Sequence, residues 1–265
     1  MLNRNSHEID FKIYGDDMQL IEIELDPQES VIAEAGAMTM MTEAIEMETL
    51  FGDGSSQEEG IMGKLLGAGK RLLTGGSLFM TVFTNKGQRK QHVSFSAPCP
   101  GKIIPLDLSQ LGGKIICQKD SFLCAAKGVS IGLAFTKKIG AGFFGGEGFI
   151  LQKLEGDGLA FVHAGGTIIE KELKPGEVLR VDTGCLVAMT KDVDYDIQMV
   201  KGIKSMLFGG EGLFFAALRG PGKVWIQSLP LSRLANRIYS ATTVAGGKSK
   251  EQGGILGTLG NLLQE

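Results

Sequence analysis

Cysteine, histidine, tyrosine and tryptophan are scarce in this sequence of 265 residues, which contains four Cys, three His, three Tyr and one Trp. No two cysteines form a CxxC pair, and the histidines do not cluster with them. Neither a disulfide framework nor a zinc site is therefore expected. We predict buried, reduced thiols in a cytoplasmic protein that holds no metal and no cofactor.

Long apolar stretches and a surplus of positive charge are also missing. No run of about 18 apolar residues occurs, so no transmembrane helix is expected, and residues 1–10 lack the apolar core of a secretory signal. The 27 Lys and Arg against 30 Asp and Glu give a net charge of −3, whereas a general nucleic-acid binder needs basic residues to displace counterions from phosphates. We therefore predict no appreciable binding of nucleic acid.

Glycine, in contrast, is abundant, with 39 residues. Many short segments rich in Val, Ile, Phe and Thr alternate between apolar and polar residues, as half-buried strands do. Strands are predicted at 18–25, 78–83, 102–106, 168–173, 186–189, 195–200 and 223–229. A short amphipathic helix is predicted at 230–239, where Leu231, Leu234 and Ile238 have helical spacing. The chain is therefore predicted to be all-β with few short helices.

Internal repeats divide the chain. Phe-Gly-Gly-Glu-Gly at 144–148 recurs at 208–212, an offset of 208 − 144 = 64 residues. A second pattern, two apolar residues, a short polar stretch and an apolar strand, appears at 29–38, 113–125 and 175–189. Repeats of this length indicate tandem β subdomains. We predict three β units at 1–74, 75–140 and 141–240, followed by a flexible tail with an amphipathic segment at 241–265.

Four motifs together carry a family resemblance: 144–154, His-Ala-Gly-Gly at 163–166, Pro-Gly-Glu to Val-Asp-Thr-Gly at 175–184, and Gly-Pro-Gly-Lys-Val-Trp-Ile-Gln-Ser-Leu-Pro at 220–230. They resemble the bacterial members of the altered-inheritance-of-mitochondria protein 24 family. The resemblance implies three tandem β-sandwich or short double-stranded β-helix units, similar to the tryptophan RNA-binding attenuation protein. It further implies that three chains close a ring of nine units. The family has no agreed biochemical activity.

The Gly-Gly-Glu-Gly turns place Glu147 and Glu211 at corresponding positions of the repeat. One interpretation is a pair of carboxylates at a cleft between units, able to bind a ligand or to act as acid and base. The other, which duplication favours, is that each Glu bonds to backbone amides and stabilises its own turn.

Three further residues are candidates for a site. His163 lies at a strand end, and Trp225 lies between two apolar residues. Each is expected to be structural, with ligand binding or ring stacking as the functional alternative. Asp182 begins the Asp-Thr-Gly tripeptide of aspartic proteases. The matching second loop that such an enzyme needs is absent from the corresponding positions, so Asp182 is predicted to cap a turn.

Two segments could contact a partner. Residues 61–73 resemble a phosphate loop, but five residues separate Gly63 from Gly69 and Arg71 follows Lys70, so the required pattern is broken. This segment is a basic amphipathic stretch for a protein or a membrane surface, or a solvated connector between strands. Residues 255–263 carry leucines at helical spacing that could dock on a neighbour or on the chain's own body.

These features favour a non-enzymatic protein that forms a homotrimeric, ring-like assembly or scaffold and binds a protein or lipid partner. The alternative is a small-molecule-binding or hydrolytic protein that uses Glu147 and Glu211.

Overall fold

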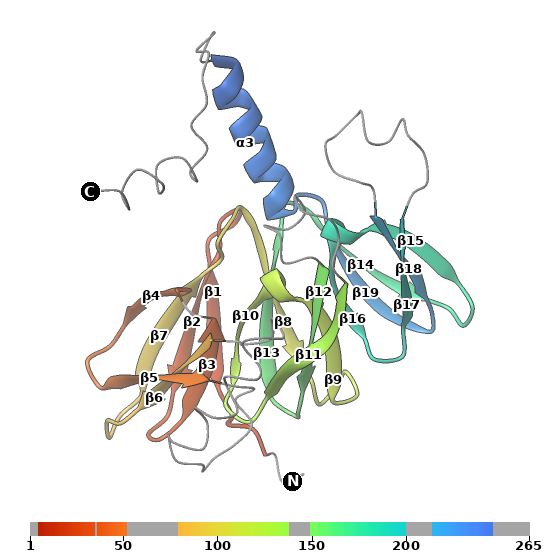
Figure 1. Cartoon of the computed structure of the whole chain (residues 1–265). Helices are drawn as coiled ribbons and strands as arrows, with labels where there is room; N and C mark the ends of the chain where they lie inside the picture. Colours follow the sequence, from red (N-terminus) through yellow and green to blue (C-terminus); the bar gives the residue numbers. More distant parts are fainter. Residues whose placement is uncertain (1–4, 35, 52–78, 138–148, 200–213, 246–265) are drawn as a thin grey trace, which may run out of the picture. The chain divides into compact units, whose positions relative to one another are not determined.

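The computed structural model describes residues 5–34, 36–51, 79–137, 149–199 and 214–245. The chain forms two compact units. Residues 1–230 hold the strands β1 to β19, and residues 231–265 hold the helix α3 (Leu231–Ala245), as Figure 1 shows.

The strands have the following bounds. They are β1 (Asp10–Tyr14), β2 (Leu20–Leu25), β3 (Ser30–Glu34), β4 (Met38–Met41), β5 (Ile45–Phe51), β6 (Phe79–Asn85), β7 (Gln91–Ser96), β8 (Gly101–Asp107), β9 (Lys114–Gln118), β10 (Phe122–Ala126), β11 (Ser130–Lys137), β12 (Phe149–Glu155), β13 (Leu159–Gly165), β14 (Ile168–Leu173), β15 (Val178–Asp182), β16 (Leu186–Thr190), β17 (Asp194–Met199), β18 (Phe214–Arg219) and β19 (Gly222–Gln227). Two 3₁₀ helices, η1 (Lys119–Ser121) and η3 (Thr183–Cys185), link β9 to β10 and β15 to β16.

The predicted all-β class is confirmed. Each strand predicted from alternation has a counterpart within a few residues, and β14 has the predicted bounds. The predicted helix is also confirmed. It begins directly after Pro230 and runs to Ala245, beyond the predicted end at residue 239.

The strands build four sheets, and all the pairings among them are antiparallel. The first sheet has the order β1-β2-β7-β4, and the second has the order β5-β6-β3-β10-β13-β8. The third sheet is β11-β12-β9-β16-β19-β14, and the fourth is β15-β18-β17.

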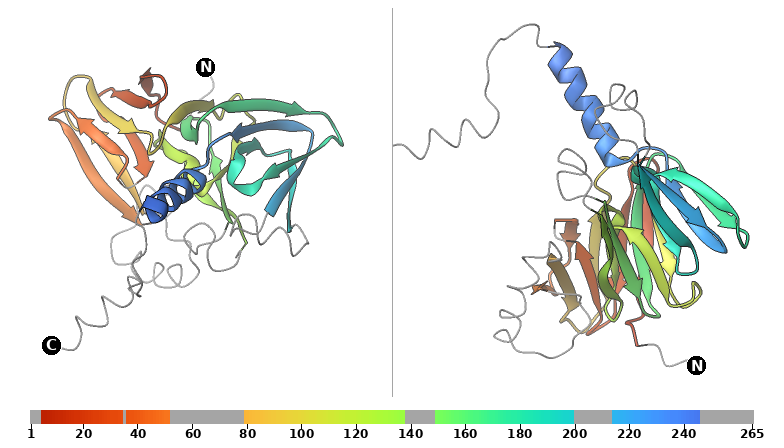
Figure 2. Two further views of the ribbon diagram at one scale, coloured as in Figure 1. Left: turned by 90° about the horizontal axis from the view of Figure 1, so that it is seen from above. Right: turned by 45° about the vertical axis from the view of Figure 1, so that its right-hand side comes forward.

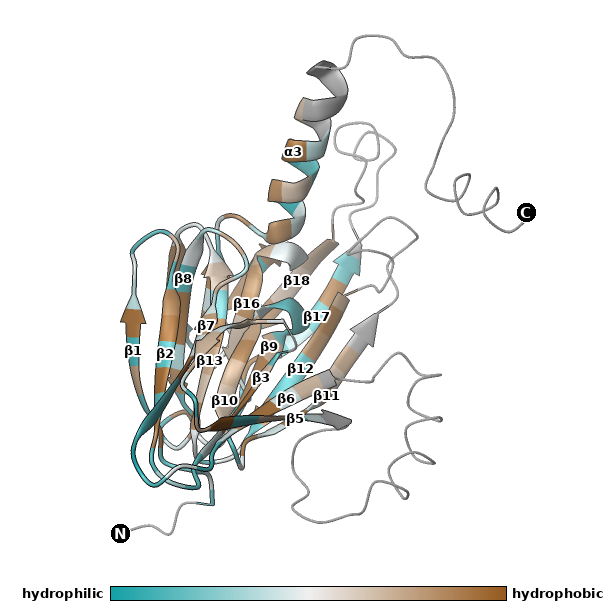
Figure 3. Ribbon diagram, turned by 90° about the vertical axis from the view of Figure 1, so that its left-hand side faces the viewer, coloured by the Kyte–Doolittle hydropathy of each residue, from teal (hydrophilic) through white to brown (hydrophobic). Residues whose placement is uncertain are grey.

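The sheets follow one another as layers (Figure 2), and three apolar cores lie between successive sheets. The first core joins residues of the first and second sheets, such as Ile23 and Ala33. The second core joins the second and third sheets, for example through Val162 and Leu154. The third core joins the third and fourth sheets, for example through Met189 and Leu218. The two middle sheets are therefore covered on both faces, and their central strands β10, β13 and β16 are buried along nearly their whole length and mostly apolar (Figure 3).

Two strand pairs, which we call joints, connect segments that are distant in the sequence. In the second sheet β3 pairs with β10, and in the third sheet β9 pairs with β16. In both joints the pairing strands are buried nearly throughout.

Corresponding elements of the second and third predicted units begin a constant number of residues apart. From β9 to β15 the offset is 178 − 114 = 64 residues, from η1 to η3 it is 183 − 119 = 64, and from β10 to β16 it is 186 − 122 = 64. A register shift also occurs at matching places in three strands: between Met38 and Met40 of β4, between Phe122 and Cys124 of β10, and between Leu186 and Ala188 of β16. The residue that follows each shift is therefore a common reference point.

Strand pairing crosses both predicted unit boundaries. β3 and β5 pair with β6 across residues 74 and 75, and β11 pairs with β12 across residues 140 and 141. The three segments as separate domains remain a prediction.

Candidate functional site

Two edge strands, β4 and β15, differ from the other edge strands because their counterparts in the repeat are paired on both sides. β4 ends the first sheet and β15 ends the fourth sheet. Within the described residues, neither has a pairing strand on its outer side. The strands that correspond to them do: β10 and β16 match β4 by their register shifts, and β9 matches β15 by the 64-residue offset. β9, β10 and β16 all take part in the joints.

β4 exposes apolar side chains where its counterparts bury them. Met40, the residue after the register shift, is 52% exposed, and Met41 is 41% exposed. The residues after the shift in the counterpart strands, Cys124 and Ala188, are fully buried. Met38 packs on the first core, and Met40 and Met41 pair with Ser94 and Val93 of β7 while their side chains are exposed.

β15 shows the same contrast. Val178 at its start is 49% exposed and Arg180 is exposed, whereas the counterpart of Arg180 in β9, Ile116, is buried. Val181 packs on the third core, so only one face of the strand is covered. Asp182 ends the strand and accepts a hydrogen bond from the Gly184 amide at 2.9 Å, which confirms the predicted capped turn.

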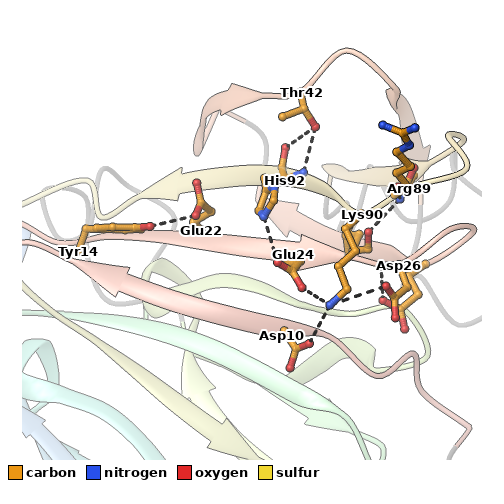
Figure 4. Close-up of polar contacts among 12 residues, drawn as sticks. Asp10, Tyr14, Glu22, Glu24, Asp26, Thr42, Arg89, Lys90 and His92 are labelled. Carbon is orange, nitrogen blue, oxygen red and sulfur yellow. Dashed lines mark hydrogen bonds and ion pairs between the residues drawn. The ribbon is translucent and has the colours of Figure 1, made fainter.

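A polar network covers the outer face of the first sheet beside β4 (Figure 4). Lys90 forms an ion pair with Glu24 and lies 4.0 Å from carboxylate oxygens of both Asp10 and Asp26. The hydrogen bond from Lys90 holds the pKa of Glu24 below its usual value. His92 Nε2 lies 3.2 Å from Glu24 Oε2. Lys90 lies among three carboxylates, and the ion pairs of this network join its own residues.

The Thr42 side chain links this network to the end of β4. Its Oγ1 accepts a hydrogen bond from the His92 amide at 3.0 Å, and the Thr42 amide donates to the His92 carbonyl at 2.9 Å. These bonds hold the exposed end of β4 against β7. The edge is therefore a formed strand and not a loose segment.

Glu34 at the end of β3 is the described acidic residue with the largest pKa change. Burial raises its pKa to about 7, the charge of Asp120 adds to the rise, and Lys119 opposes it. The folded carboxyl therefore keeps its proton between about pH 4.5 and 7, where the unfolded chain has lost it. Stability from this group is complete below about pH 4.5 and is lost as the pH rises through 7.

Glu34→Gln, which keeps the shape of the neutral side chain, is expected to remove this loss. At pH 8 the variant should be more stable than the parent by on the order of 2 kcal/mol, and at pH 5 the difference should shrink toward zero. Urea unfolding of both proteins at the two pH values measures it. Equal stability at pH 8 would show that Glu34 ionises freely in the folded chain.

His163 lies on β13 and is 5% exposed. Neither ring nitrogen makes a hydrogen bond of normal geometry with the described residues, although the backbone of Asp120 lies near enough to favour the protonated ring. Burial lowers the pKa of His163, which keeps the ring neutral at physiological pH. Gln227 is the counterpart of His163 in the repeat, since 227 − 163 = 64. Its side chain accepts a hydrogen bond from the Gly165 amide and donates one to the Gly184 carbonyl.

Trp225 lies on β19 and is 4% exposed, within the second core. Its Nε1 donates a hydrogen bond to Glu170 Oε2 at 3.1 Å. A second bond joins Glu170 to Lys223 at 2.7 Å. His163 and Trp225 lie on β13 and β19, two strands of different sheets that contact each other. Both side chains are buried, and neither lies on β4 or β15.

The other predicted contact residues lie outside the described part of the chain. These are Glu147, Glu211 and the segments 61–73 and 255–263. Their sequence positions can still be compared: Glu147 lies between β11 and β12, and Glu211 lies between β17 and β18. The described residues contain no group of three or more His, Cys, Asp and Glu side chains placed to hold a metal. None of the helices in that part is long and apolar enough to cross a membrane.

Sequence reasoning did not single out Met40, Met41, Val178 or Arg180. The signal was present in the repeated pattern at 29–38, 113–125 and 175–189, which contains or adjoins the strands of both joints. Aligning the three copies would have shown which two edges have paired counterparts.

Fold and edges together define an antiparallel, layered β protein with two incompletely paired ends. The family model described as Mitochondrial biogenesis AIM24 matches residues 11–229. An uncharacterized protein of Streptococcus pyogenes serotype M6 is 32% identical over 222 residues, which cover 83% of this chain and 85% of that protein. A crystal structure of a Streptococcus pyogenes protein has a TM-score of 0.69 at 25% identity and covers 88% of this chain and 100% of that one.

The chain therefore belongs to the AIM24 family, as its sequence motifs predicted, and the relatives compared above are bacterial.

Proposed function

We propose that this protein is a non-enzymatic assembly or scaffold protein, built from three related β units, whose copies join into a homotrimeric ring. A cytoplasmic location belongs to this proposal. The assembly offers a surface to a protein or a membrane, and the segments 61–73 and 255–263 are the proposed contact regions. Nucleic acid is not expected as a partner because the net charge of −3 provides no general attraction to phosphates.

The observation that carries the proposal is the pair of open edges. An exposed edge strand presents unpaired N–H and C=O groups, and natural proteins usually cover, charge or shorten such edges. β4 exposes Met40 and Met41 and β15 exposes Val178, while the corresponding strands are paired inside the chain.

The three units are supported by the spacing of the elements. The segments that join matching strands, β5 to β6, β11 to β12 and β17 to β18, are all rich in glycine. A ring would present these three connections of every chain at repeated positions. A scaffold with repeated, glycine-rich connections suits several weak contacts to one partner, because linked contacts add up to strong binding.

Light scattering tests the assembly directly. The expected mass at micromolar concentration is three times that of the 28.3 kDa chain. A single species of 28.3 kDa over the whole concentration range would contradict the proposal.

A further inference from the structure

We propose that β15 of one copy pairs with β4 of a second copy in an antiparallel joint, with Val181 opposite Met40 and Arg180 opposite Met41. The inference rests on the proposed assembly and specifies its interface. It joins the fourth sheet of one copy to the first sheet of the next, giving a continuous sheet in the order β17-β18-β15-β4-β7-β2-β1.

The two joints inside the chain determine this register. In the first joint, Cys124 of β10 lies opposite Ala33 of β3. In the second joint, Ala188 of β16 lies opposite Cys117 of β9. Cys124 and Ala188 are the residues that follow the register shift in their strands, so both joints use the same reference point.

Met40 and Val181 occupy these reference positions in the two free edges. Met40 follows the register shift in β4, as Cys124 does in β10. Val181 lies 181 − 117 = 64 residues after Cys117. The next pair in each joint, Ala125 with Ile32 and Met189 with Ile116, places Met41 opposite Arg180 by the same rule.

The cores on both sides of the joints favour this pairing. In the first joint, Cys124 and Ala33 face the first core, while Ala125 and Ile32 face the second core. By the same alternation, Met40 of the second copy would pack beside Val181, against the third core of the first copy. Met41 would lie beside Arg180, at the first core of the second copy. The first copy would thereby cover the exposed methionines of the second. Burying their apolar surface stabilises the joint.

Arg180 differs from its apolar counterparts in the two internal joints. At the edge of the first core its long side chain can cover apolar surface with its methylene groups and keep the guanidinium in water. A charged residue at this position also opposes non-specific pairing of β15 with strands of other proteins, as charged residues do on many natural edge strands.

The joint is head-to-tail because its two surfaces differ. β4 and β15 lie at opposite sides of the strand-built unit in Figure 1, so one chain cannot pair its own two edges. Such an interface closes into a ring when the rotation between copies permits. The occupant of each edge is therefore a second copy of this chain.

Cysteine cross-linking tests the register in the full chain. Directly opposite residues of antiparallel strands have Cα atoms about 4.5–5.5 Å apart, which suits a disulfide. M40C combined with V181C should form cross-linked dimers and trimers on a non-reducing gel under mild oxidation. Each pair of cysteines is placed in one chain, which also carries C185S because Cys185 is the native cysteine that is partly exposed.

Two further pairs serve as controls. M41C with R180C replaces exposed residues only, so it tests the adjacent pair without disturbing the third core, and it should also cross-link. M40C with V178C is three positions out of register, roughly 10 Å along the strand, and should give at least tenfold less product. Equal yields from the matched and shifted pairs would contradict the proposed register.

A charge in the joint tests its contribution. M40K should raise the protein concentration at half-assembly at least tenfold by light scattering. M47K makes the same change at a methionine that is 48% exposed on the edge strand β5, and it should leave assembly unchanged.

The outcomes separate this inference from the proposed function. An intact trimer without cross-linking at either matched pair, and unaffected by M40K, would overturn the joint and leave the assembly standing. A monomer at every concentration would overturn both. Cross-linking at the matched pairs, together with dissociation by M40K alone, supports both.

Discussion

Replacing Phe161 by alanine is expected to lower the free energy of unfolding by about 3–5 kcal/mol. Phe161 is fully buried on β13, inside the first core. It lies between β10 and β8, opposite Cys124 and Pro105. Removing the ring leaves a cavity in a sheet that is covered on both faces, so the surrounding strands cannot collapse freely into the space.

Phe11 provides the matched control because its ring meets that of Phe161 edge to face, with centroids 4.9 Å apart, but is 39% exposed. F11A removes the same ring contact from its exposed end and should cost about 1–2 kcal/mol. Urea unfolding of both variants, at one protein concentration so that assembly contributes equally, gives the comparison. Equal losses would show that the ring contact, and not burial in the core, carries the energy.

Gly101→Ala is expected to destabilise the chain by roughly 3 kcal/mol, at the upper end of the usual cost of overpacking. Gly101 begins β8 and lies opposite Gly165 of β13. A Cβ at Gly101 would overlap the carbonyl oxygen of Ala164. Because this obstacle is backbone and not a flexible side chain, the strands must move apart to admit the methyl group.

Gly132→Ala is the control for this variant. Gly132 lies on β11, at the edge of the third sheet, and a Cβ there would meet only the flexible side chain of Lys153, at 2.9 Å from its Cε. The expected change is within about 1 kcal/mol, with alanine gaining from its smaller loss of backbone entropy. Thermal unfolding of the two variants measures the difference. A loss for Gly132→Ala as large as that for Gly101→Ala would contradict the backbone explanation.

Local pattern predicted the strands but carried no prediction of their partners. β14 was predicted with its observed bounds because alternation and flanking turns are local signals. The joint between β3 and β10 connects residues such as Ala33 and Cys124, which lie far apart in the sequence, and no local signal reports that pairing. The glycine-rich segments near 75 and 140 look like connections between units. Pairing of β5 with β6 and of β11 with β12 shows that they connect strands of one sheet.

The candidate site was missed for a related reason. Met40 and Met41 look like ordinary strand residues, and their exposure depends on β4 having no further neighbouring strand among the described residues. That property exists only after the sheets are assembled. Glu147 and Glu211 attracted attention because glycine-rich turns are conspicuous in a sequence, whereas an open sheet edge is not.

The two joints inside the chain have a consequence for the abundance of the protein. Their strands belong to one covalent chain, so β3 meets β10 and β9 meets β16 at any dilution. In the assembly that we propose, only the joint between copies would depend on concentration. Dilution would then separate whole chains, each with its three cores intact, and not individual units. A cell that makes less of the protein would lose complete assemblies while each remaining chain kept its fold.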